Sequence, residues 1–188
     1  MTDIIELYMA CGDFHTAVKQ SGLPVHVAHL KLLKSGCLKI QDKIKYGSKG
    51  AKLGGMAEEL FQRLVPEAID ANRYFQKNNP VYDFCLKDIT IDVKYSSFHK
   101  NKRYSTKNGS WQVRAVGEQD FIVAFLEREV GAELNDPYIL LLPMQFIDVR
   151  NGLTISKSSP WFKEFIIESE ELQPTLKEYV DLRAQGLF

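Results

Sequence analysis

ITIDVKYS, at residues 89–96, alternates strictly between apolar and polar side chains. A period of two is typical of a β-strand that buries one of its faces. Asp92 and Lys94 therefore project from the same polar face of this strand, a short distance apart. The segment predicts a half-buried strand that presents a carboxylate and an ammonium together.

A second strand is predicted immediately upstream, at residues 81–86 (VYDFCL). Lys87 and Asp88 separate the two strands and suit a tight hairpin turn. Pairing across this turn brings Asp83 near Asp92. Two carboxylates and one lysine are thus expected to share a small patch.

These residue types suit the hydrolysis of a phosphodiester. Mg²⁺ prefers oxygen ligands, usually takes one or two protein carboxylates and leaves positions for water and phosphate. It polarises the phosphodiester and lowers the pKa of a bound water. A nearby lysine can orient that water and offset the charge that builds on the phosphate. For so short a motif, a solvent-facing strand with a cross-strand charge pair is the competing interpretation.

An amphipathic helix is predicted from about residue 56 to residue 71. At about 100° per residue, Glu58 falls at the edge of its apolar stripe, whereas Glu59 points away from the stripe into water. A helix packed on the sheet would therefore bring Glu58 towards the two aspartates. The apolar stripe consists of Ala57, Leu60, Phe61, Leu64, Val65 and Ala68.

Three segments, in this order, resemble the motifs of the PD-(D/E)xK nuclease superfamily, which includes archaeal Holliday-junction resolvases and many restriction enzymes. The resemblance covers roughly residues 53–126 and follows the family's frequent order of helix, hairpin and further strands. Tyr82 stands where the family name has proline. The segments are residues 55–61 (with Gly55, Glu58 and Phe61), residues 82–84 (YDF) and residues 91–94 (IDVK).

The resemblance implies a restriction-endonuclease-like core and a Mg²⁺-dependent DNA endonuclease in which Mn²⁺ can replace Mg²⁺. Carried over by position, Asp83 and Asp92 would be metal ligands, and Glu58 would be the helix acid that joins them as a third ligand. Lys94 would position the attacking water. Gln112 resembles a polar residue that some of these nucleases place near the site.

Further strands are predicted at residues 111–116, 121–126 and 138–142, and a final helical region holds Trp161, Phe165 and Leu176. A helix, several strands and a last helix predict an α/β domain around a mixed sheet flanked by helices. Trp111 is expected in the core. Asp120 is interpreted as a capping or solvated residue.

Residues 2–36 are predicted to form three short helices. A Gly-containing turn before Pro24 joins the second to the third, as in a helix-turn-helix, which this segment resembles. The third helix is expected to bury Val27, Leu30 and Leu33, with Leu32 beside them. Residues 38–46 alternate around Gln41-Asp42, as in the hairpin of a winged helix.

Residues 47–55 (GSKGAKLGG) are interpreted as a linker because they hold four glycines and no acid. The predicted boundary separates a DNA-binding module at residues 1–50 from a nuclease domain at residues 51–188. A helical protein-interaction module is the alternative for the first part.

The net charge of zero conceals two basic stretches without acids, at residues 15–41 and 95–116. Such stretches are typical of nucleic-acid contact surfaces, although solvated loops also show them. The residues expected to contact DNA are His26, His29, Lys31 and Lys34 on the third helix and Lys100, Lys102, Arg103, Lys107, Gln112 and Arg114 near the site.

The chain has no apolar run of membrane-spanning length and no secretory pattern at its N-terminus. We therefore expect an intracellular, nucleoid-associated protein in the cytoplasm that acts on DNA. Cleavage of both strands would be easiest for a homodimer. A non-catalytic DNA-binding regulator whose C-terminal domain binds a ligand or partner, and an RNA-directed nuclease, are the alternatives.

Overall fold

A computed structural model of the chain describes residues 3–39, 48–74, 82–100, 109–147 and 152–188. It begins with three helices, α1 (Ile4–Cys11), α2 (Phe14–Ser21) and α3 (Val25–Ser35). Asp13 caps α2 by accepting a hydrogen bond from the backbone N–H of Thr16. Gly22, with a φ of 67°, ends α2 in the left-handed conformation that glycine adopts without strain. The three predicted helices are therefore present.

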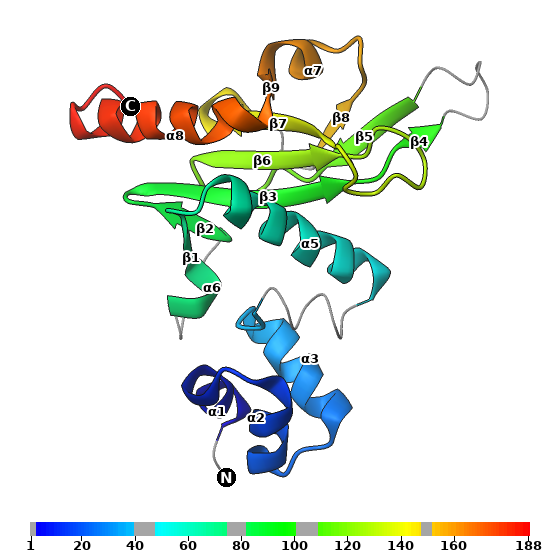
Figure 1. The fold of residues 1–188 in the computed structure, drawn as a ribbon, viewed down its shortest axis with the longest axis vertical. Helices are drawn as coiled ribbons and strands as arrows, with labels where there is room; N and C mark the ends of the chain where they lie inside the picture. Colours follow the sequence, from blue (N-terminus) through cyan, green and yellow to red (C-terminus); the bar gives the residue numbers. More distant parts are fainter. Residues whose placement is uncertain (1–2, 40–47, 75–81, 101–108, 148–151) are drawn as a thin grey trace.

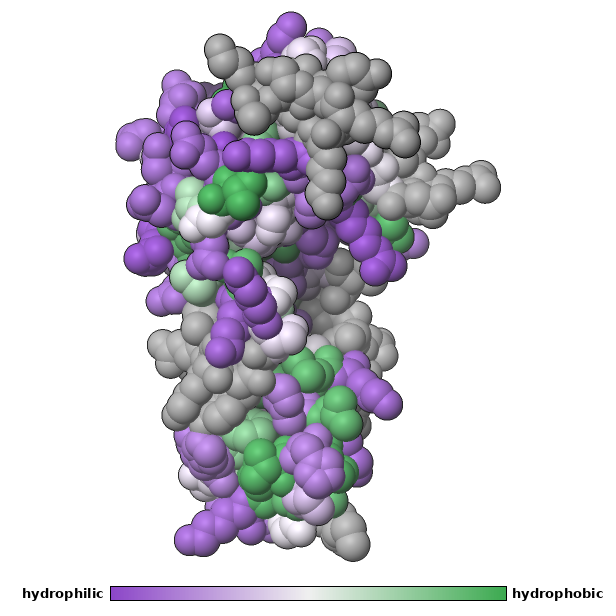
Figure 2. Space-filling model, turned by 90° about the vertical axis from the view of Figure 1, so that its right-hand side faces the viewer, coloured by the Kyte–Doolittle hydropathy of each residue, from purple (hydrophilic) through white to green (hydrophobic). Residues whose placement is uncertain are grey.

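These helices form a core of their own, in which Tyr8, Phe14 and Leu32 are fully buried. The predicted inner face of α3 is wrong in part. Ala28 and Leu32 face the core, whereas Leu30 is 53% exposed and Leu33 is 39% exposed. A small alanine allows α3 to approach its neighbours closely, so the leucines on the other side stay outside. Figure 2 shows hydrophobic surface gathered over this lower, helical part of the molecule.

The next helix, α5 (Lys49–Leu64), begins earlier than its sequence predicts. Most of the expected linker is thus helical, and Ser48 caps it by accepting a hydrogen bond from the N–H of Ala51 (3.3 Å). Each interior glycine costs a helix about 1 kcal/mol relative to alanine. Burial of Leu53, Ala57 and Phe61 against the sheet compensates for that cost. The predicted winged hairpin at residues 38–46 lies almost wholly outside the described residues.

The central sheet has six strands in the order β1-β2-β3-β6-β7-β9. β3 and β6 are parallel, and the other neighbours are antiparallel, so the sheet is mixed. Between the strands lie α6 (Ala71–Tyr74) and the short helix η1 (Met144–Phe146). The strands are β1 (Ile69–Asp70), β2 (Phe84–Leu86), β3 (Ile89–Ser96), β6 (Phe121–Leu126), β7 (Tyr138–Pro143) and β9 (Ile166–Ile167).

Different layers cover the two faces of this sheet (Figure 1). Apolar side chains of α5 and α8 (Ser169–Ala184) pack on Ile91 and Val93 of β3 and their neighbours. The other face carries a second sheet, β4 (His99–Lys100), β5 (Gly109–Val113) and β8 (Leu153–Ile155), together with α7 (Pro160–Phe165). The predicted α/β architecture, a mixed sheet flanked by helices, is confirmed. No described helix is long and apolar enough to cross a membrane.

Candidate active site

Asp83 and Asp92 meet at the end of the β2–β3 hairpin. Phe84 pairs with Ile91, so the next residues outward along the two strands are these two aspartates. The predicted turn at Lys87-Asp88 sets this register, and Lys87 has a φ of 55° there. β2 begins at Phe84, so it offers no backbone carbonyl to the N–H of Val93. The Asp83 side chain accepts that hydrogen bond instead, through its Oδ2 (2.9 Å).

Asp92 and Lys94 form an ion pair on the polar face of β3. The Lys94 Nζ lies 2.6 Å from the Asp92 Oδ1, and Asp92 is only 5% exposed. Burial and the neighbouring Asp83 carboxylate raise the pKa of Asp92 to about 7, although Lys94 acts in the opposite direction. The pair of acids therefore holds a proton up to near-neutral pH, as expected for two carboxylates that share a site.

A pocket of about 480 Å³ opens beside this hairpin and is lined by residues from four parts of the chain. Glu58 reaches it from α5, Asp83 from the start of β2, and Lys94 from β3. Glu58 is 7% exposed and Glu59 is exposed, so the helix faces the sheet in the predicted orientation. Three of the four predicted catalytic residues line one pocket, and Asp92 is paired to Lys94 on its wall.

The second sheet closes the other side of this pocket. The backbone N–H of Gln112 donates a hydrogen bond to the Ser96 Oγ (3.0 Å), which ties β5 to the polar face of β3. The Gln112 side chain is exposed, lines the pocket and exchanges hydrogen bonds with the Thr154 hydroxyl (3.0 and 3.1 Å). His99, which the sequence did not single out, lines the pocket next to it.

The donor set for a metal is smaller than the sequence suggests. Among the described residues, no group of three or more His, Cys, Asp or Glu side chains is arranged to hold a metal ion. Asp83 and Asp92 remain as an adjacent pair of oxygen donors. One or two protein carboxylates, with water in the other positions, suffice for Mg²⁺. The two aspartates thus fit such an ion, and Glu58 borders the same pocket.

The predicted DNA-binding residues are distributed over two separate areas. His26, Lys31 and Lys34 are exposed on α3. His29 differs from the expectation, because its ring lies edge-on to Phe14 at 5.9 Å and its Nε2 is buried. Lys100, next to His99, and Arg114, just past β5, are exposed, and neither lines the pocket. Lys102, Arg103 and Lys107 lie outside the described residues.

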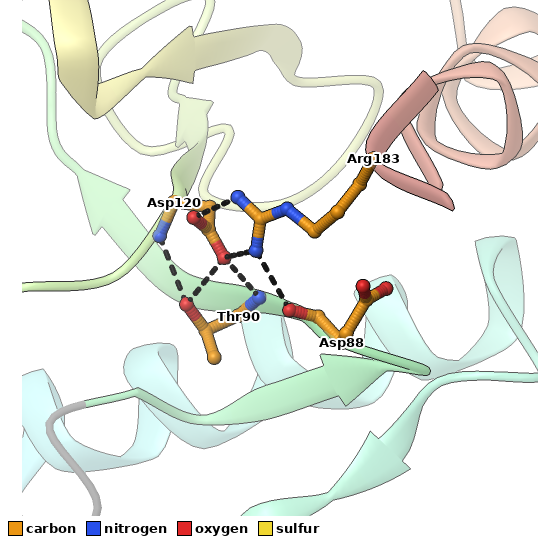
Figure 3. A network of polar contacts seen from close by, with 4 residues as sticks. All are labelled: Asp88, Thr90, Asp120 and Arg183. Carbon is orange, nitrogen blue, oxygen red and sulfur yellow. Dashed lines mark hydrogen bonds and ion pairs between the residues drawn. The ribbon is translucent and has the colours of Figure 1, made fainter. Parts of the chain in front are cut away.

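Asp120 has a structural role that its sequence context does not reveal. The carboxylate accepts hydrogen bonds from both terminal nitrogens of Arg183 (2.6 and 3.0 Å) and from the N–H and hydroxyl of Thr90 (2.8 Å each) (Figure 3). Burial opposes its ionisation, but Arg183 and Thr90 outweigh burial and hold the pKa of Asp120 below its usual range. This network fixes α8 to the starts of β3 and β6, so Asp120 is neither a capping nor a solvated residue.

Glu127 is a second structural acid that sequence reasoning missed. It is 4% exposed and accepts backbone hydrogen bonds from Phe98 (2.8 Å), Gly131 (2.9 Å) and Glu133 (2.9 Å). The indole of Trp111, fully buried as predicted, donates to the Glu127 carbonyl (2.8 Å). Glu127 thereby fixes the chain that leads into β4. The only sequence signal is a glutamate at the end of an apolar strand.

The chain matches no family model, and no curated protein is similar enough to count as a relative.

Proposed function

We propose that this chain is a Mg²⁺-dependent DNA endonuclease with a restriction-endonuclease-like core. The observation that carries the proposal is that Asp83, Asp92 and Lys94 adjoin one another at the edge of a pocket that Glu58 also lines. The sequence resemblance to the PD-(D/E)xK superfamily assigns catalytic roles to these same four residues. Acids that share a proton beside a paired lysine are typical of catalytic rather than purely structural sites.

Asp83 and Asp92 would hold the ion, and Mn²⁺ would substitute for Mg²⁺. When bound, the ion would supply a polarised phosphodiester and a water of lowered pKa. The proton that Asp92 retains at neutral pH would leave on binding, because the ligand is the carboxylate. Glu58 would act from the pocket wall, outside the ligand pair.

Lys94 would orient the attacking water and offset charge on the phosphate. The ion pair with Asp92 fixes its ammonium at the pocket, where it is one-third exposed (33%) and can reach a substrate. An ammonium positioned before the reaction stabilises developing charge without reorganising in the transition state. Gln112 would contact the substrate from the second sheet.

The helices α1–α3 would act as a helix-turn-helix module that binds DNA. In support, the exposed face of α3 carries His26, Lys31 and Lys34, and α3 contains no acid. Such side chains would contact phosphates and base edges if α3 entered the major groove. Lys100 and Arg114 would contact the backbone near the site. A homodimer would give one site for each strand.

Nicking of a supercoiled plasmid with Mg²⁺, with EDTA, and with Asp92→Asn or Lys94→Met tests the catalytic proposal. We expect nicking by the wild type with Mg²⁺ and a loss of at least about 100-fold in each other arm. Asp88→Asn and Lys163→Met change exposed residues outside the pocket and should retain activity. Equal nicking in all arms would refute the proposal that this chain is a nuclease.

Two further outcomes would redirect the proposal. Binding of plasmid without nicking under any divalent cation would favour the non-catalytic regulator. Faster cleavage of RNA than of duplex, branched or single-stranded DNA would favour the RNA-directed nuclease. A mobility shift of the full chain that survives Lys94→Met and is lost in Lys31→Ala/Lys34→Ala would assign binding to α3.

A further inference from the structure

His99 opens β4 beside the pocket that holds the predicted catalytic residues. It is exposed and lines this pocket together with Lys94 and Gln112. Its strand pairs antiparallel with β5, where His99 lies opposite Ser110. Gln112 lies two residues farther along β5, on the same face of that strand as Ser110. His99 therefore approaches the pocket from the second sheet, whereas the carboxylates of Glu58 and Asp83 approach from α5 and β2.

The residue before it fixes the direction of His99. Phe98 packs on Trp111 with ring centroids 5.1 Å apart, and its N–H donates to Glu127 (2.8 Å). The Phe98 ring lies so close to Gly109 that a Cβ there would be 2.2 Å from it. Neighbouring residues of a strand point to opposite faces. With Phe98 packed against Trp111 on one face, the exposed His99 is directed outward, to the pocket.

Two charged groups of the pocket are already engaged. Lys94 is paired with Asp92, and Asp83 holds the Val93 N–H. Within the part of the chain that the structure describes, the His99 side chain makes no hydrogen bond or ion pair. Two of its neighbours in the pocket, Gln112 of β5 and Ser97 just after β3, are uncharged. Among the described residues that line the pocket, His99 supplies an imidazole, the group that most often transfers a proton in catalysis.

Hydrolysis of a phosphodiester needs such a group. The attacking water oxygen forms a bond to phosphorus while the bond from phosphorus to the bridging oxygen breaks. The departing oxygen then carries the electron pair of that bond as an alkoxide, which is a poor leaving group. A general acid that supplies a proton to it contributes typically about 10²–10⁴-fold to the rate.

We propose that His99 is this general acid and protonates the leaving oxygen, an inference that rests on the proposed nuclease function. The His99 imidazolium gives its proton to the bridging oxygen as the P–O bond breaks, and the neutral imidazole is reprotonated from solvent. The attacking water gives up its proton to solvent by way of the carboxylates that approach from α5 and β2, and Lys94 offsets the charge on the phosphate. The products are a phosphomonoester and an alcohol, with atoms and charge balanced.

A substrate that needs no acid tests this assignment. The bridging oxygen that leaves, identified from the product ends, is replaced by sulfur, because a thiolate departs without protonation. We expect His99→Ala to cleave the ordinary substrate about 100-fold more slowly than the wild type and the bridging phosphorothiolate within about 3-fold of it. His15→Ala, which removes an exposed histidine of α2, should match the wild type on both substrates.

Binding is measured separately, by fluorescence anisotropy with labelled DNA in EDTA. If His99→Ala binds DNA with the same affinity as the wild type, His99 acts as a general acid rather than as a contact to the phosphate. Equal slowing on both substrates, or no slowing on the ordinary one, would overturn the role of His99 while the nuclease stands. A wild type that cleaves neither substrate would remove the proposed function, and this inference with it.

Discussion

The carboxylates of Asp83 and Asp92 lie side by side where β2 begins and β3 continues beyond it, paired only with β6. Burial and this neighbour raise the pKa of Asp92 to about 7, even though Lys94 lies 2.6 Å away. One oxygen of the Asp83 carboxylate accepts a hydrogen bond from the N–H of Val93 (2.9 Å). The protein thus keeps two acids together at a cost in stability, which is typical of sites selected for function.

Asp92→Asn should stabilise the protein at alkaline pH. A raised folded pKa means that the contribution of Asp92 is fully present below its unfolded value, about 4, and is lost as the pH rises to about 7. Asparagine resembles the protonated acid and can still donate to Asp83. In EDTA we expect a gain in Tm of at least ~3 °C at pH 8, about 1 kcal/mol for this chain length, and a smaller gain at pH 4. Asp88→Asn is the control, and an equal gain at both pH values would contradict the argument.

Asp83→Asn should lower the pKa of Asp92. The amide oxygen can still accept from Val93, so the hairpin is retained while the negative charge is removed. Burial remains the larger cause, so the pKa should fall clearly below 7 without reaching its usual value. Carboxyl ¹³C chemical shifts followed through a pH titration measure it. An unchanged midpoint would show that Asp83 does not act on Asp92.

The sequence predicted the hairpin and its acids well because local signals coincide there. Strict alternation fixes the bounds of β3, and the Lys87-Asp88 turn fixes which residues face each other. The apolar run at residues 121–126 likewise gives the bounds of β6 correctly. Where the hydrophobic period and the turn residues indicate the same structure, local sequence determines the element's bounds and tertiary packing changes them little.

Other features were missed because distant contacts determine them. Four glycines indicated a linker, yet α5 extends back to Lys49 because its apolar residues meet the sheet. Asp120 looks like a capping residue until Arg183, 63 positions later, lies beside it. The orientation of α3 depended on counting Ala28 as a core residue. A single sequence carries no local signal for any of these contacts.

Removal of Asp120 should destabilise the protein by about 2 kcal/mol, because it leaves the Arg183 side chain, only 26% exposed, without its carboxylate partner. Denaturant unfolding of Asp120→Ala, Arg183→Met and the double variant measures the coupling. The double variant should be less destabilised than the sum of the two. The pKa of Asp120 is lowered in the folded protein, so the stabilisation is present above about pH 4 and is lost as the pH falls through the lower folded value. Additive losses at pH 7 would show that the pair contributes nothing.

Glu127→Ala should lower stability by about 3 kcal/mol or more, since three backbone N–H groups lose their acceptor. Glu127→Gln keeps one acceptor oxygen and should lose less. Because Glu127 also holds Phe98, hydrogen exchange at β4 and β5 should accelerate more than at β6. A uniform change in exchange across all three strands would mean that Glu127 acts only on global stability.

Gly54→Ala should raise stability and lower cleavage together. Gly54 lies inside α5, and a Cβ there would meet nothing within 4 Å, so the helix gains about 0.5–1 kcal/mol. Gly54 also lines the pocket, where an added methyl group takes space from a bound phosphate backbone. Lys52→Ala, at an exposed position of the same helix that does not line the pocket, should change the free energy of unfolding by no more than about 0.5 kcal/mol and leave cleavage close to that of the wild type. Thermal unfolding and plasmid nicking on the same preparations give both quantities. A variant that is more stable and equally active would place the substrate away from α5.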